Sequence, residues 1–543
     1  MNELELWQRY RKYLCTCPTI GLQVDISRML FPDDFLDTIG EKLSRAFSAM
    51  TEMEHGGEAN INEHRMVGHY WLRSPELAPN ADIRAEIERT VAVVKKFAED
   101  VHEQRIIPER SDGFFVVLVI GIGGSVLGSQ FVCDASGRGD DPMVVRFIDN
   151  ADPDGIDRTL DELDETLDQT LTIVISKSGD TKETRNAMLE VAAAYLRAGL
   201  NFARHAVAIT RESSSLHQRA VGEHWLATFP MWDWVGGRTS VLSAVGLLPA
   251  ALQGVDIDSL LSGARECDVV TRRVHMIENP AALLAAMWHF ARKERNQRNM
   301  AILPYRDRLS FFSRYLQQLV MESIGKERSR TGLIVHEGLT VYGNKGSADQ
   351  HSFVQQLLDG PDDFFVTFIE VLRDRQEKSL MVDEDVSTGD YLHGFLYGTR
   401  AALYEKGRQS ITITLNELNA GSVGVLIALF ERTVGLYAEM IDVNAYDQPG
   451  VEAGKKAADR VLDLQKKVLD FLRAHRGSDF TVEAIAAGIG EPDSVETILH
   501  LLDHAAANPD HEIILAPGAN PGTMTTPPNR SWAVCLSARY CAS

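Results

Sequence analysis

The stretch Leu171–Thr184, LTIVISKSGDTKET, joins a short apolar run to the start of an amphipathic segment that continues towards Leu200. The run Leu171–Ile175 predicts a buried strand, and the segment after it predicts a helix. The first backbone N–H groups of a helix have no partner within it, and the helix dipole adds partial positive charge there. Hydroxyls, a glycine and a lysine at this point therefore predict a phosphate site.

The side chains that could bind phosphate oxygens in this turn are Ser176, Lys177, Ser178 and Thr181. Serine and threonine at a helix start usually cap the helix, a contribution of about 0.5 to 2 kcal/mol, and we expect one of them to do so here. The four groups are more donors than a helix cap uses, and a phosphomonoester offers several acceptor oxygens for them. The Walker pattern G-x-x-x-x-G-K-[ST] is absent from this turn, which excludes a Walker-type nucleotide site.

Similar apolar runs occur on both sides of this stretch, at Phe114–Ile120, Met143–Ile148 and His205–Ile209. Their alternation with helical or glycine-rich segments is typical of a parallel, doubly wound sheet. A second block repeats the pattern more loosely, with runs at Met300–Leu303, Leu333–Val335, Phe364–Val371 and Ile411–Leu415. The sequence therefore predicts an α/β fold with two mainly parallel sheets flanked by helices.

The expected organisation is a helical N-terminal cap over residues 1–110, one α/β domain over 111–278 and a second over 279–477. A long amphipathic helix after Pro449 is expected to close the second domain. Residues 478–543 are expected to form a small helical extension with an irregular tail. The extension weakly resembles a helix-turn-helix or winged-helix module, but it has few basic residues, so a packing role is the better interpretation.

The composition restricts the partners of this 543-residue chain. Its formal charge of -22 would repel nucleic acid and anionic membranes, so we expect neither as a partner. Six cysteines show no C-x-x-C spacing, and neither a zinc site nor a disulfide scaffold is predicted. The start of the chain has no signal-peptide pattern, and no uninterrupted apolar run approaches the roughly 20 residues of a membrane helix. We expect a cytoplasmic protein.

Two further glycine-rich turns precede predicted helices. Gly121–Ser125, GIGGS, allows the backbone to approach a ligand closely, although a tight turn explains it equally well. Its spacing is not G-x-G-x-x-G, which disfavours a dinucleotide. Gly236–Ser240, GGRTS, contributes Arg238, a permanent cation that could stabilise an oxyanion. Taken alone, Arg238 would more simply form a surface salt bridge.

Three residues could transfer protons. Glu322 lies seven residues after Tyr315 in a predicted helix, which places it on an aromatic-flanked face with Gln318 one turn earlier. A partly desolvated carboxylate suits a base, although an exposed pair with Lys326 explains Glu322 as well. His351 follows a glycine-bearing turn at or near a helix start, and Lys455 lies two turns into the late helix. Each of these two residues is more often structural when considered alone.

Together, IGIGGSVLGS, SKSGDTKET, GGRTS, LQQLVMESIGKE, DQHSFVQQLLDG and DQPGVEAGKK resemble the glucose-6-phosphate isomerase family, over residues 110 to 475 or so. The resemblance implies two sugar-isomerase-type domains. It also implies reversible isomerisation of D-glucose 6-phosphate to D-fructose 6-phosphate in glycolysis and gluconeogenesis, with no metal and no organic cofactor.

The resemblance also implies a role for each candidate residue. Glu322 is then the base that moves a proton between C2 and C1 through a cis-enediolate, and Arg238 stabilises that intermediate. His351 and Lys455 open the sugar ring, and the family implies a homodimer in which the neighbouring subunit supplies the histidine. The substrate-binding residues are then Gly124, Ser125, Ser176, Lys177, Ser178, Thr181, Gln318 and Gln448.

The phosphate turn departs from the Ser-Lys-Thr-Phe-Thr-Thr form that is common in the family. Ser178, Gly179 and Asp180 replace part of it, and Asp180 places negative charge near the phosphate. Asp180 could face solvent or favour the helix dipole.

Two other functions stay open. An isomerase that also accepts mannose 6-phosphate would keep the same glutamate, although the full-size chain favours the glucose-specific type. A non-catalytic sugar-phosphate sensor would have lost the base or the ring-opening residues, and Glu322, His351 and Lys455 are all present.

Overall fold

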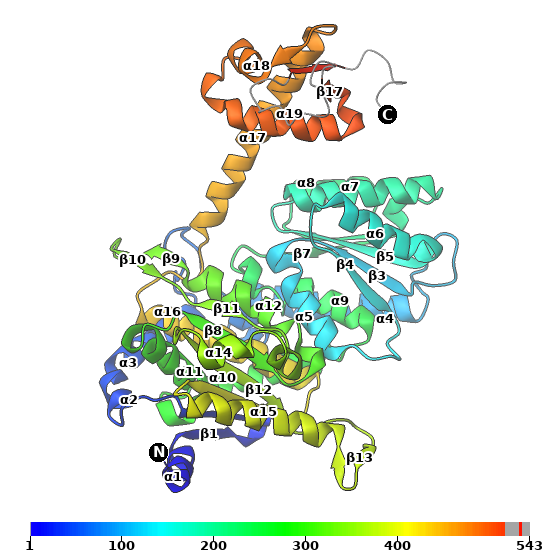
Figure 1. Ribbon diagram of the computed structural model, residues 1–543. Coiled ribbons are helices and arrows are strands. Elements are labelled where there is room, and N and C mark those ends of the chain that lie inside the picture. Colours follow the sequence, from blue (N-terminus) through cyan, green and yellow to red (C-terminus); the bar gives the residue numbers. More distant parts are fainter. Residues whose placement is uncertain (1, 516–530, 535–543) are drawn as a thin grey trace. The chain divides into compact units, whose positions relative to one another are not determined.

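A computed structural model describes residues 2–515 and 531–534. The chain divides into two compact units, one that ends at Asp447 and one that begins at Gln448. Figure 1 shows the elements of each unit, and each is described here by itself.

The first sheet has five parallel strands in the order β4-β3-β5-β6-β7. Their alternating side chains point into two cores, because Val117, Ile173 and Val207 belong to one apolar cluster and Leu118, Val174 and Ala208 to another. Helices therefore cover both faces (Figure 1). The strands are β3 (Val116–Ile120), β4 (Val144–Ile148), β5 (Thr170–Ser176), β6 (Ala206–Thr210) and β7 (Ala227–Pro230). The surrounding helices are α4 (Ala81–His102), α5 (Leu127–Ser136), α6 (Pro153–Leu163), α7 (Lys182–Arg197), α8 (Ser215–Gly222) and α9 (Ala244–Gln253).

The second sheet has six strands in the order β1-β2-β15-β12-β8-β11. Strands β15, β12, β8 and β11 are parallel, and they also separate two apolar clusters. The strands are β1 (Leu14–Cys17), β2 (Leu22–Arg28), β8 (Asn299–Pro304), β11 (Thr340–Tyr342), β12 (Phe364–Val371) and β15 (Ser410–Leu415). Two mainly parallel sheets with helices on both faces confirm the predicted fold class.

The helices around the second sheet are α1 (Glu3–Tyr13), α2 (Phe35–Thr38), α3 (Gly40–Glu54), α10 (Ile257–Thr271), α11 (Pro280–His289), α12 (Phe312–Leu316), α13 (Gly346–Gln350), α14 (Val354–Asp359), α15 (Thr388–Glu405) and α16 (Ala420–Met440). Two short ribbons complete the first unit, β9 (Lys326–Arg328) with β10 (Ile334–Glu337), and β13 (Met381–Asp383) with β14 (Val386–Ser387).

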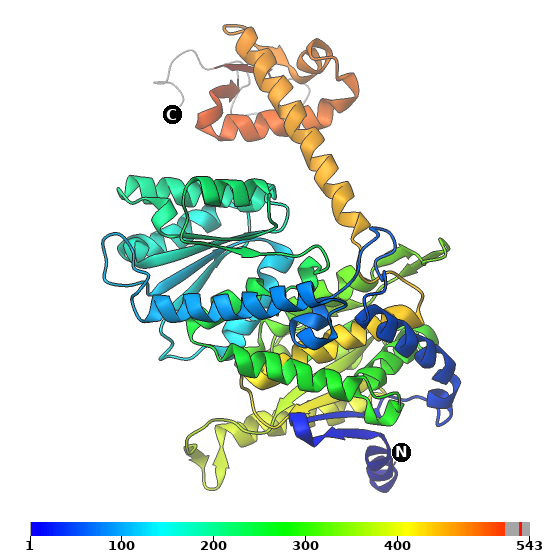
Figure 2. The ribbon, with the colours of Figure 1, turned by 180° about the vertical axis from the view of Figure 1, so that it is seen from behind.

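Two details of this sheet differ from the sequence prediction. The N-terminal region, expected to be a helical cap, contributes β1 and β2, and β2 pairs antiparallel with β15 (Figure 2). The run Leu333–Val335, expected as a sheet strand, lies in the β9–β10 ribbon instead, and the sheet strand is β11. These segments are short, so their pairing depends on distant residues rather than on local pattern.

A buried ionic network joins the N-terminal region to α10 and α16. Arg73 donates two hydrogen bonds to Asp268, at 2.7 and 3.1 Å, and another to Glu431. Arg432 bonds to Glu54 and lies 3.2 Å from Asp268, and Arg272 also bonds to Glu54. Because three guanidinium groups face three carboxylates, the network is neutral when all of them are charged.

Helix α16 is buried in the apolar cluster that also contains residues of α10 and α11. In the described residues it is the one helix that is long and apolar enough to cross a membrane, yet 89% of its apolar window is buried inside the protein. A Cβ on Gly424 would lie 2.0 Å from the carbonyl oxygen of Leu260, so α16 packs closely against α10. Burial of this kind is typical of a core helix.

The second unit has its own core. It contains α17 (Pro449–Ala474), α18 (Val482–Gly488), α19 (Val495–Ala507) and a three-stranded antiparallel sheet of β16 (Phe480–Thr481), β18 (Ser531–Val534) and β17 (Ile513–Leu515). Leu464, Val468 and Leu472 of α17 pack in one cluster with Ile485 and Ile498.

This core corrects two sequence predictions. The late helix was expected to close the second α/β domain, but its apolar face packs with α18 and α19. The extension is not purely helical, because it includes the small sheet. The residues predicted as an irregular tail lie outside the described residues, apart from β18. The domain boundaries at residues 110, 278 and 477 remain a proposal.

Candidate active site

Two glycine-rich turns meet backbone to backbone. The turn after β3 contains Gly123, whose φ of 56° lies in the left-handed region that favours glycine. A Cβ on Gly124 would lie 2.2 Å from the carbonyl carbon of Gly237, so only glycine fits this contact. Ser240 also donates to the carbonyl oxygen of Gly124 at 3.2 Å. The two turns therefore form one continuous backbone wall.

Arg238 projects from this wall to Glu322. Its Nη1 lies 3.1 Å from Oε2 of Glu322, and its Nη2 donates to the carbonyl oxygens of Ala445 at 2.9 Å and Asp447 at 2.7 Å. The Arg238 side chain is 5% exposed, whereas the Glu322 side chain is 18% exposed. The guanidinium is thus fixed by backbone carbonyls, and the carboxylate keeps an open side that a ligand can reach.

Glu322 ends a π-helical turn. Helix α12 continues as η11 (Gln317–Glu322), and such π turns occur frequently at functional sites. The wider turn breaks the α-helical spacing between Tyr315 and Glu322 on which the sequence prediction relied. The prediction that Glu322 lies on an aromatic-flanked face is therefore wrong. Tyr315 stacks on Phe131 in the core, with ring centroids 5.5 Å apart, while Glu322 faces Arg238.

The alternative pairing of Glu322 with Lys326 is also wrong. Lys326 Nζ donates to the backbone carbonyl of Glu322 at 3.1 Å and lies 2.8 Å from the Asp447 carboxylate. The Glu322 carboxylate is thereby left to Arg238. Gln318 approaches the first glycine turn, because a Cβ on Gly123 would lie 3.2 Å from its Nε2. Its predicted place beside Glu322 remains a prediction.

Helix α7, which follows the predicted phosphate turn, has no side-chain cap at its N-terminus. Thr181 is the N-cap residue of α7, but its side chain makes no capping hydrogen bond. Instead, Ser176 Oγ donates to Thr181 Oγ1 at 3.0 Å and accepts from the Gly179 N–H at 3.2 Å. The expectation that a hydroxyl of this turn caps the helix is therefore wrong. The first N–H groups of α7 have no side-chain cap, as an anion site requires.

The charged residues of the same turn point in different directions. Lys177 Nζ donates to the carbonyl oxygens of Asp233 at 3.1 Å and Val235 at 2.8 Å, and burial lowers its pKa to about 8. Asp180 accepts a hydrogen bond from Ser215 Oγ at 2.5 Å, which fixes its carboxylate at the start of α8. Ser178 Oγ accepts from the Asp180 N–H at 3.2 Å.

The remaining predicted residues are His351, Gln448 and Lys455. His351 is exposed and lies between the end of α13 and the start of α14, near a helix start as predicted. The contacts of Arg238 and Glu322 with other described residues do not include it. Gln448 is the N-cap residue of α17, and Lys455 is exposed on that helix. Both belong to the second unit. Their place in a shared site remains a prediction.

Comparison with known proteins identifies the family. The phosphoglucose isomerase family model matches residues 25–388 and 397–478. The chain belongs to the phosphoglucose isomerase family. It is 58% identical to the glucose-6-phosphate isomerase of Geotalea daltonii, an alignment that covers 95% of this chain and 98% of that protein. The glucose-6-phosphate isomerase of Geobacter sulfurreducens is also 58% identical, with 95% and 97% covered.

Solved structures agree with the family assignment. The crystal structure of a glucose-6-phosphate isomerase from Chlamydia trachomatis is 25% identical and superposes with a TM-score of 0.77, over 84% of this chain and 91% of that one. A hypothetical protein from Thermus thermophilus is 28% identical, with a TM-score of 0.68 over 81% and 99% of the two chains.

The sequence reasoning missed Asp447 as a residue that holds Arg238, and it considered Lys326 only as a partner of the Glu322 carboxylate. Asp447 supplies a carbonyl oxygen to both Arg238 and Lys326, and its carboxylate accepts from Asn62. A signal was present, since Asp447 begins the motif DQPGVEAGKK and directly precedes Gln448. No group of three or more His, Cys, Asp or Glu side chains among residues 2–515 and 531–534 is arranged to hold a metal ion.

Proposed function

We propose that this phosphoglucose isomerase family member interconverts D-glucose 6-phosphate and D-fructose 6-phosphate, in glycolysis and gluconeogenesis in the cytoplasm. The observation that supports this best is the contact of Arg238 with Glu322 beside the joined glycine turns. The names of relatives at 58% identity support the same activity.

In the proposed reaction, Glu322 removes the C2 proton of the open-chain aldose and returns it to C1. The electrons shift towards the carbonyl oxygen O1, and a cis-enediolate forms between the two carbon proton transfers. The hydroxyl proton passes from O2 to O1, so that the ketose carbonyl forms at C2. Arg238 stabilises its negative charge, because a fixed guanidinium needs no reorganisation as charge develops. The sugar would bind against the backbone wall that Gly124 and Gly237 form, beside Gly123, Ser125 and Gln318.

The phosphate would bind at the start of α7, where Ser176, Ser178 and Thr181 offer hydroxyls and the helix offers uncapped N–H groups. Ring opening precedes proton transfer. We assign it to His351 and Lys455, which would move protons between the ring oxygen and the C1 hydroxyl, with Gln448 orienting the substrate.

The titration of Lys177 predicts a pH-dependent KM. Burial lowers its pKa to about 8 in the free protein, so its charge is lost as pH rises through that value. The substrate phosphate is already fully ionised there. If the neutral amine does not bind phosphate, KM for fructose 6-phosphate rises about tenfold between pH 7 and pH 9. Initial rates over this range test it, and Lys177→Arg should flatten the rise because arginine stays charged. A wild-type KM that stays constant would contradict this role.

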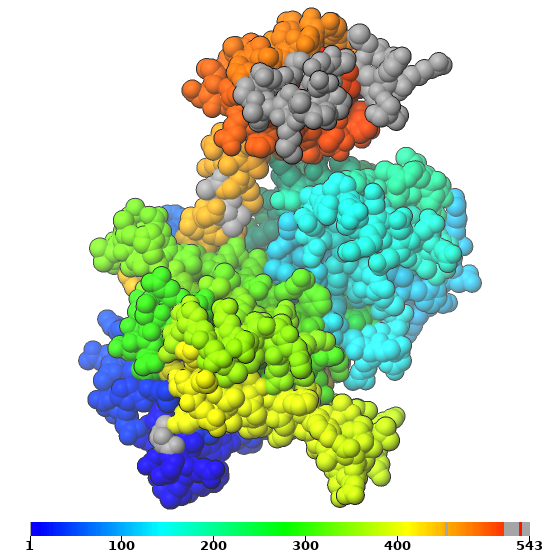
Figure 3. Space-filling model, viewed as in Figure 1, coloured from blue at the N-terminus to red at the C-terminus, as the bar shows by residue number. Residues whose placement is uncertain are grey.

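A homodimer would complete the proposed site. The β13–β14 hairpin stands out from the first unit (Figure 3). Leu380 on it is 76% exposed, and Met381, Val382, Tyr391 and Phe395 are exposed along the hairpin and α15. Gln350, the residue before His351, donates to the carbonyl oxygen of Phe395 at 3.0 Å. A second copy that covers this apolar face would therefore lie beside the exposed His351.

Mixing two inactive variants tests the shared site. If the partner subunit supplies the histidine, a heterodimer of His351→Ala and Glu322→Gln chains has one intact site. Random reassociation should restore about a quarter of wild-type activity, because half of the dimers are mixed and each has one active site of two. Each variant denatured and refolded alone is the control. Mixtures that stay as inactive as the controls would place His351 in its own chain's site.

The direct test of the proposed function is turnover of fructose 6-phosphate to glucose 6-phosphate by the purified protein in EDTA. Formation of glucose 6-phosphate supports the isomerase. Saturable binding without turnover would instead favour a sugar-phosphate sensor. Mannose 6-phosphate, assayed in parallel, separates a glucose-specific enzyme from one with wider specificity.

A further inference from the structure

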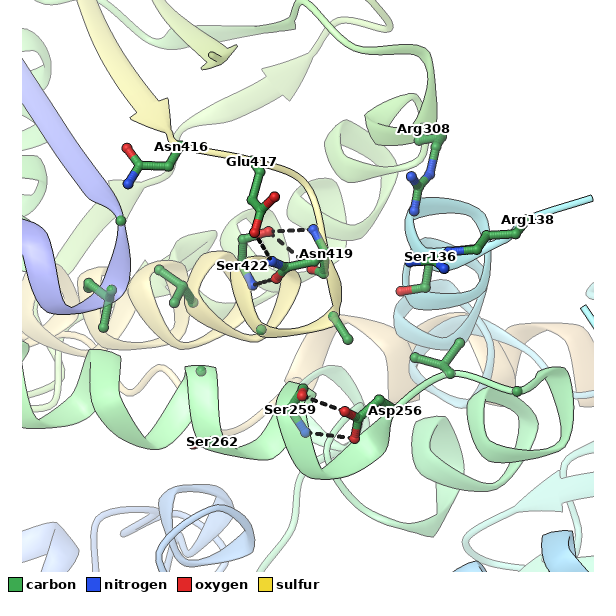
Figure 4. Close-up of a pocket in the computed structure, with 18 of the residues that line it drawn as sticks. Ser136, Arg138, Asp256, Ser259, Ser262, Arg308, Asn416, Glu417, Asn419 and Ser422 are labelled. Carbon is green, nitrogen blue, oxygen red and sulfur yellow. Dashed lines mark hydrogen bonds between the residues drawn. The ribbon is translucent and has the colours of Figure 1, made fainter. Parts of the chain in front are cut away.

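A separate pocket lies in the first unit, and none of its lining residues belongs to the candidate active site. Its volume is about 720 Å³, within the usual range of small-molecule sites. Figure 4 shows it between the start of α16, helix α10 and the end of α5.

The pocket lies at the ligand-binding edge of the second sheet. Arg308 follows β8, and Asn416 to Asn419 follow β15, so both segments leave the carboxyl ends of parallel strands. Open α/β sheets bind ligands in crevices outside these ends. The first sheet carries its glycine and phosphate turns at its own carboxyl edge, after β3 and β5.

One end of the pocket carries two cations, Arg308, whose buried Nε has no hydrogen-bond partner, and the exposed Arg138. The side chains of Arg138 and Arg308 make no hydrogen bond or ion pair with any other residue in the described ranges, 2–515 and 531–534. Burial, and then the neighbouring charges of Arg138 and Arg306, lower the pKa of Arg308, although the nearby carboxylates of Asp134 and Asp141 act in the opposite direction. Ser136 beside them is 9% exposed, and its buried Oγ has no hydrogen-bond partner. Figure 4 shows these three residues at the same end of the pocket. Two like charges and a hydroxyl without a partner indicate a missing anion.

Five carboxylates also line the pocket, and four of them already accept hydrogen bonds; the fifth is Asp140. Glu266 accepts from the Ser262 hydroxyl at 3.1 Å. Asp141 accepts from the Gln253 amide at 2.8 Å, and Asp256 accepts from the Ser259 hydroxyl at 2.5 Å. Glu417 accepts from Asn419 at 3.0 Å and from Arg373 at 3.2 Å. Glu266 belongs to α10 and Asp256 is its N-cap residue, on another wall from the arginines. They can accept hydrogen bonds from ligand hydroxyls without facing the anion.

We propose that this pocket binds a small phosphomonoester that carries hydroxyl groups. Its phosphate lies between Arg138 and Arg308, whose planar guanidinium groups match phosphate oxygens in bidentate fashion, and Ser136 donates to the same group. Its hydroxyls contact the serines and carboxylates of α10. The site is independent of the proposed isomerisation, because no residue is shared between the two.

Calorimetric titration with glycerol 3-phosphate tests the site. The titrated protein is the full chain with the substitution Lys177→Glu. This substitution places a negative charge in the candidate active-site phosphate turn and is meant to remove binding there. We expect one saturable site per chain. Arg138→Gln with Arg308→Gln should weaken binding about tenfold or more, because both charge-assisted contacts are lost. Arg45→Gln, an exposed arginine on α3, is the matched control and should leave the affinity unchanged. Methyl phosphate, which has no hydroxyl, should bind about tenfold more weakly.

Several outcomes overturn the proposal. These are no saturable binding, equal loss of affinity in the Arg45→Gln control, or equal affinity for methyl phosphate. If the Lys177→Glu protein does not fold, the binding stoichiometry of proteins that keep Lys177 is measured instead. The wild-type chain should then bind two molecules of glycerol 3-phosphate and the double arginine variant one, and equal stoichiometry in the two proteins would overturn the site.

Discussion

Replacing Glu322 by glutamine should lower kcat for fructose 6-phosphate by about 10² to 10⁴, the usual contribution of a positioned general base. The carboxamide keeps the shape of the side chain and can still bond to Arg238, but it cannot accept the C2 or C1 proton. KM should change little, since the phosphate turn is unaltered. Steady-state rates in EDTA give both values, and exchange of solvent deuterium into substrate should fall in parallel with kcat.

Glu327→Gln is the matched control for this prediction. Glu327 is an exposed glutamate on β9, five residues further along, and it lies 4.0 Å from Arg328. Its replacement should leave kcat within a factor of about two. A Glu322→Gln enzyme that keeps wild-type kcat would show that another group transfers the proton.

Replacing Asp268 by asparagine should have the largest effect on stability. Burial alone would raise the pKa of Asp268, but the Arg73 and Arg432 guanidinium groups lower it below its ordinary value. The native carboxylate is therefore ionised, and it bonds to Arg73 through both oxygens. Asparagine leaves two buried guanidinium groups short of an anion, which should cost about 3 to 5 kcal/mol of unfolding free energy. Denaturant unfolding at pH 7, followed by circular dichroism, measures it.

The pH dependence of this loss has a definite sign. Because the folded-state pKa is depressed, the contribution of Asp268 is present above its ordinary value of 3.8 and is lost as pH falls below it. The part of the difference that comes from the titration of Asp268 itself should thus stay constant from pH 8 to pH 5. Glu431, whose pKa burial raises to about 7 in the same network, adds a pH dependence of its own within this range. Asp157→Asn, an exposed aspartate on α6, is the control and should change stability by less than about 0.5 kcal/mol. A similar small change in Asp268→Asn would mean that the network relaxes without cost.

The sequence predicted the parts of the site that depend on local pattern. The strand Leu171–Ile175 and its turn occur as β5 and the start of α7, because apolar runs and turn residues act over a few positions. The glycine turns could be recognised for the same reason. Their contact through Gly124 and Gly237 could not, since it joins residues more than a hundred positions apart.

Other predictions were wrong because tertiary interactions override the regular helical spacing of residues. Glu322 left its expected face because a π turn replaced an α turn. Lys326 was drawn away from the Glu322 carboxylate by Asp447, which is distant in sequence. Helix α17 has a clear apolar face, and the sequence predicted that the second α/β domain would cover it. An apolar face does not specify its packing partner, and α18 and α19 cover it instead.

The pairing of β2 with β15 constrains how the chain folds during synthesis. Leu30, just after β2, donates to Gln409, just before β15, across 379 positions. At ribosomal speeds the partner strand emerges roughly 20 to 75 s after β2. Until then, the apolar residues Val24 and Ile26 lack their native sheet. The nascent chain therefore carries an open β edge for most of its synthesis, which is a natural point of capture for chaperones and a point of risk for aggregation.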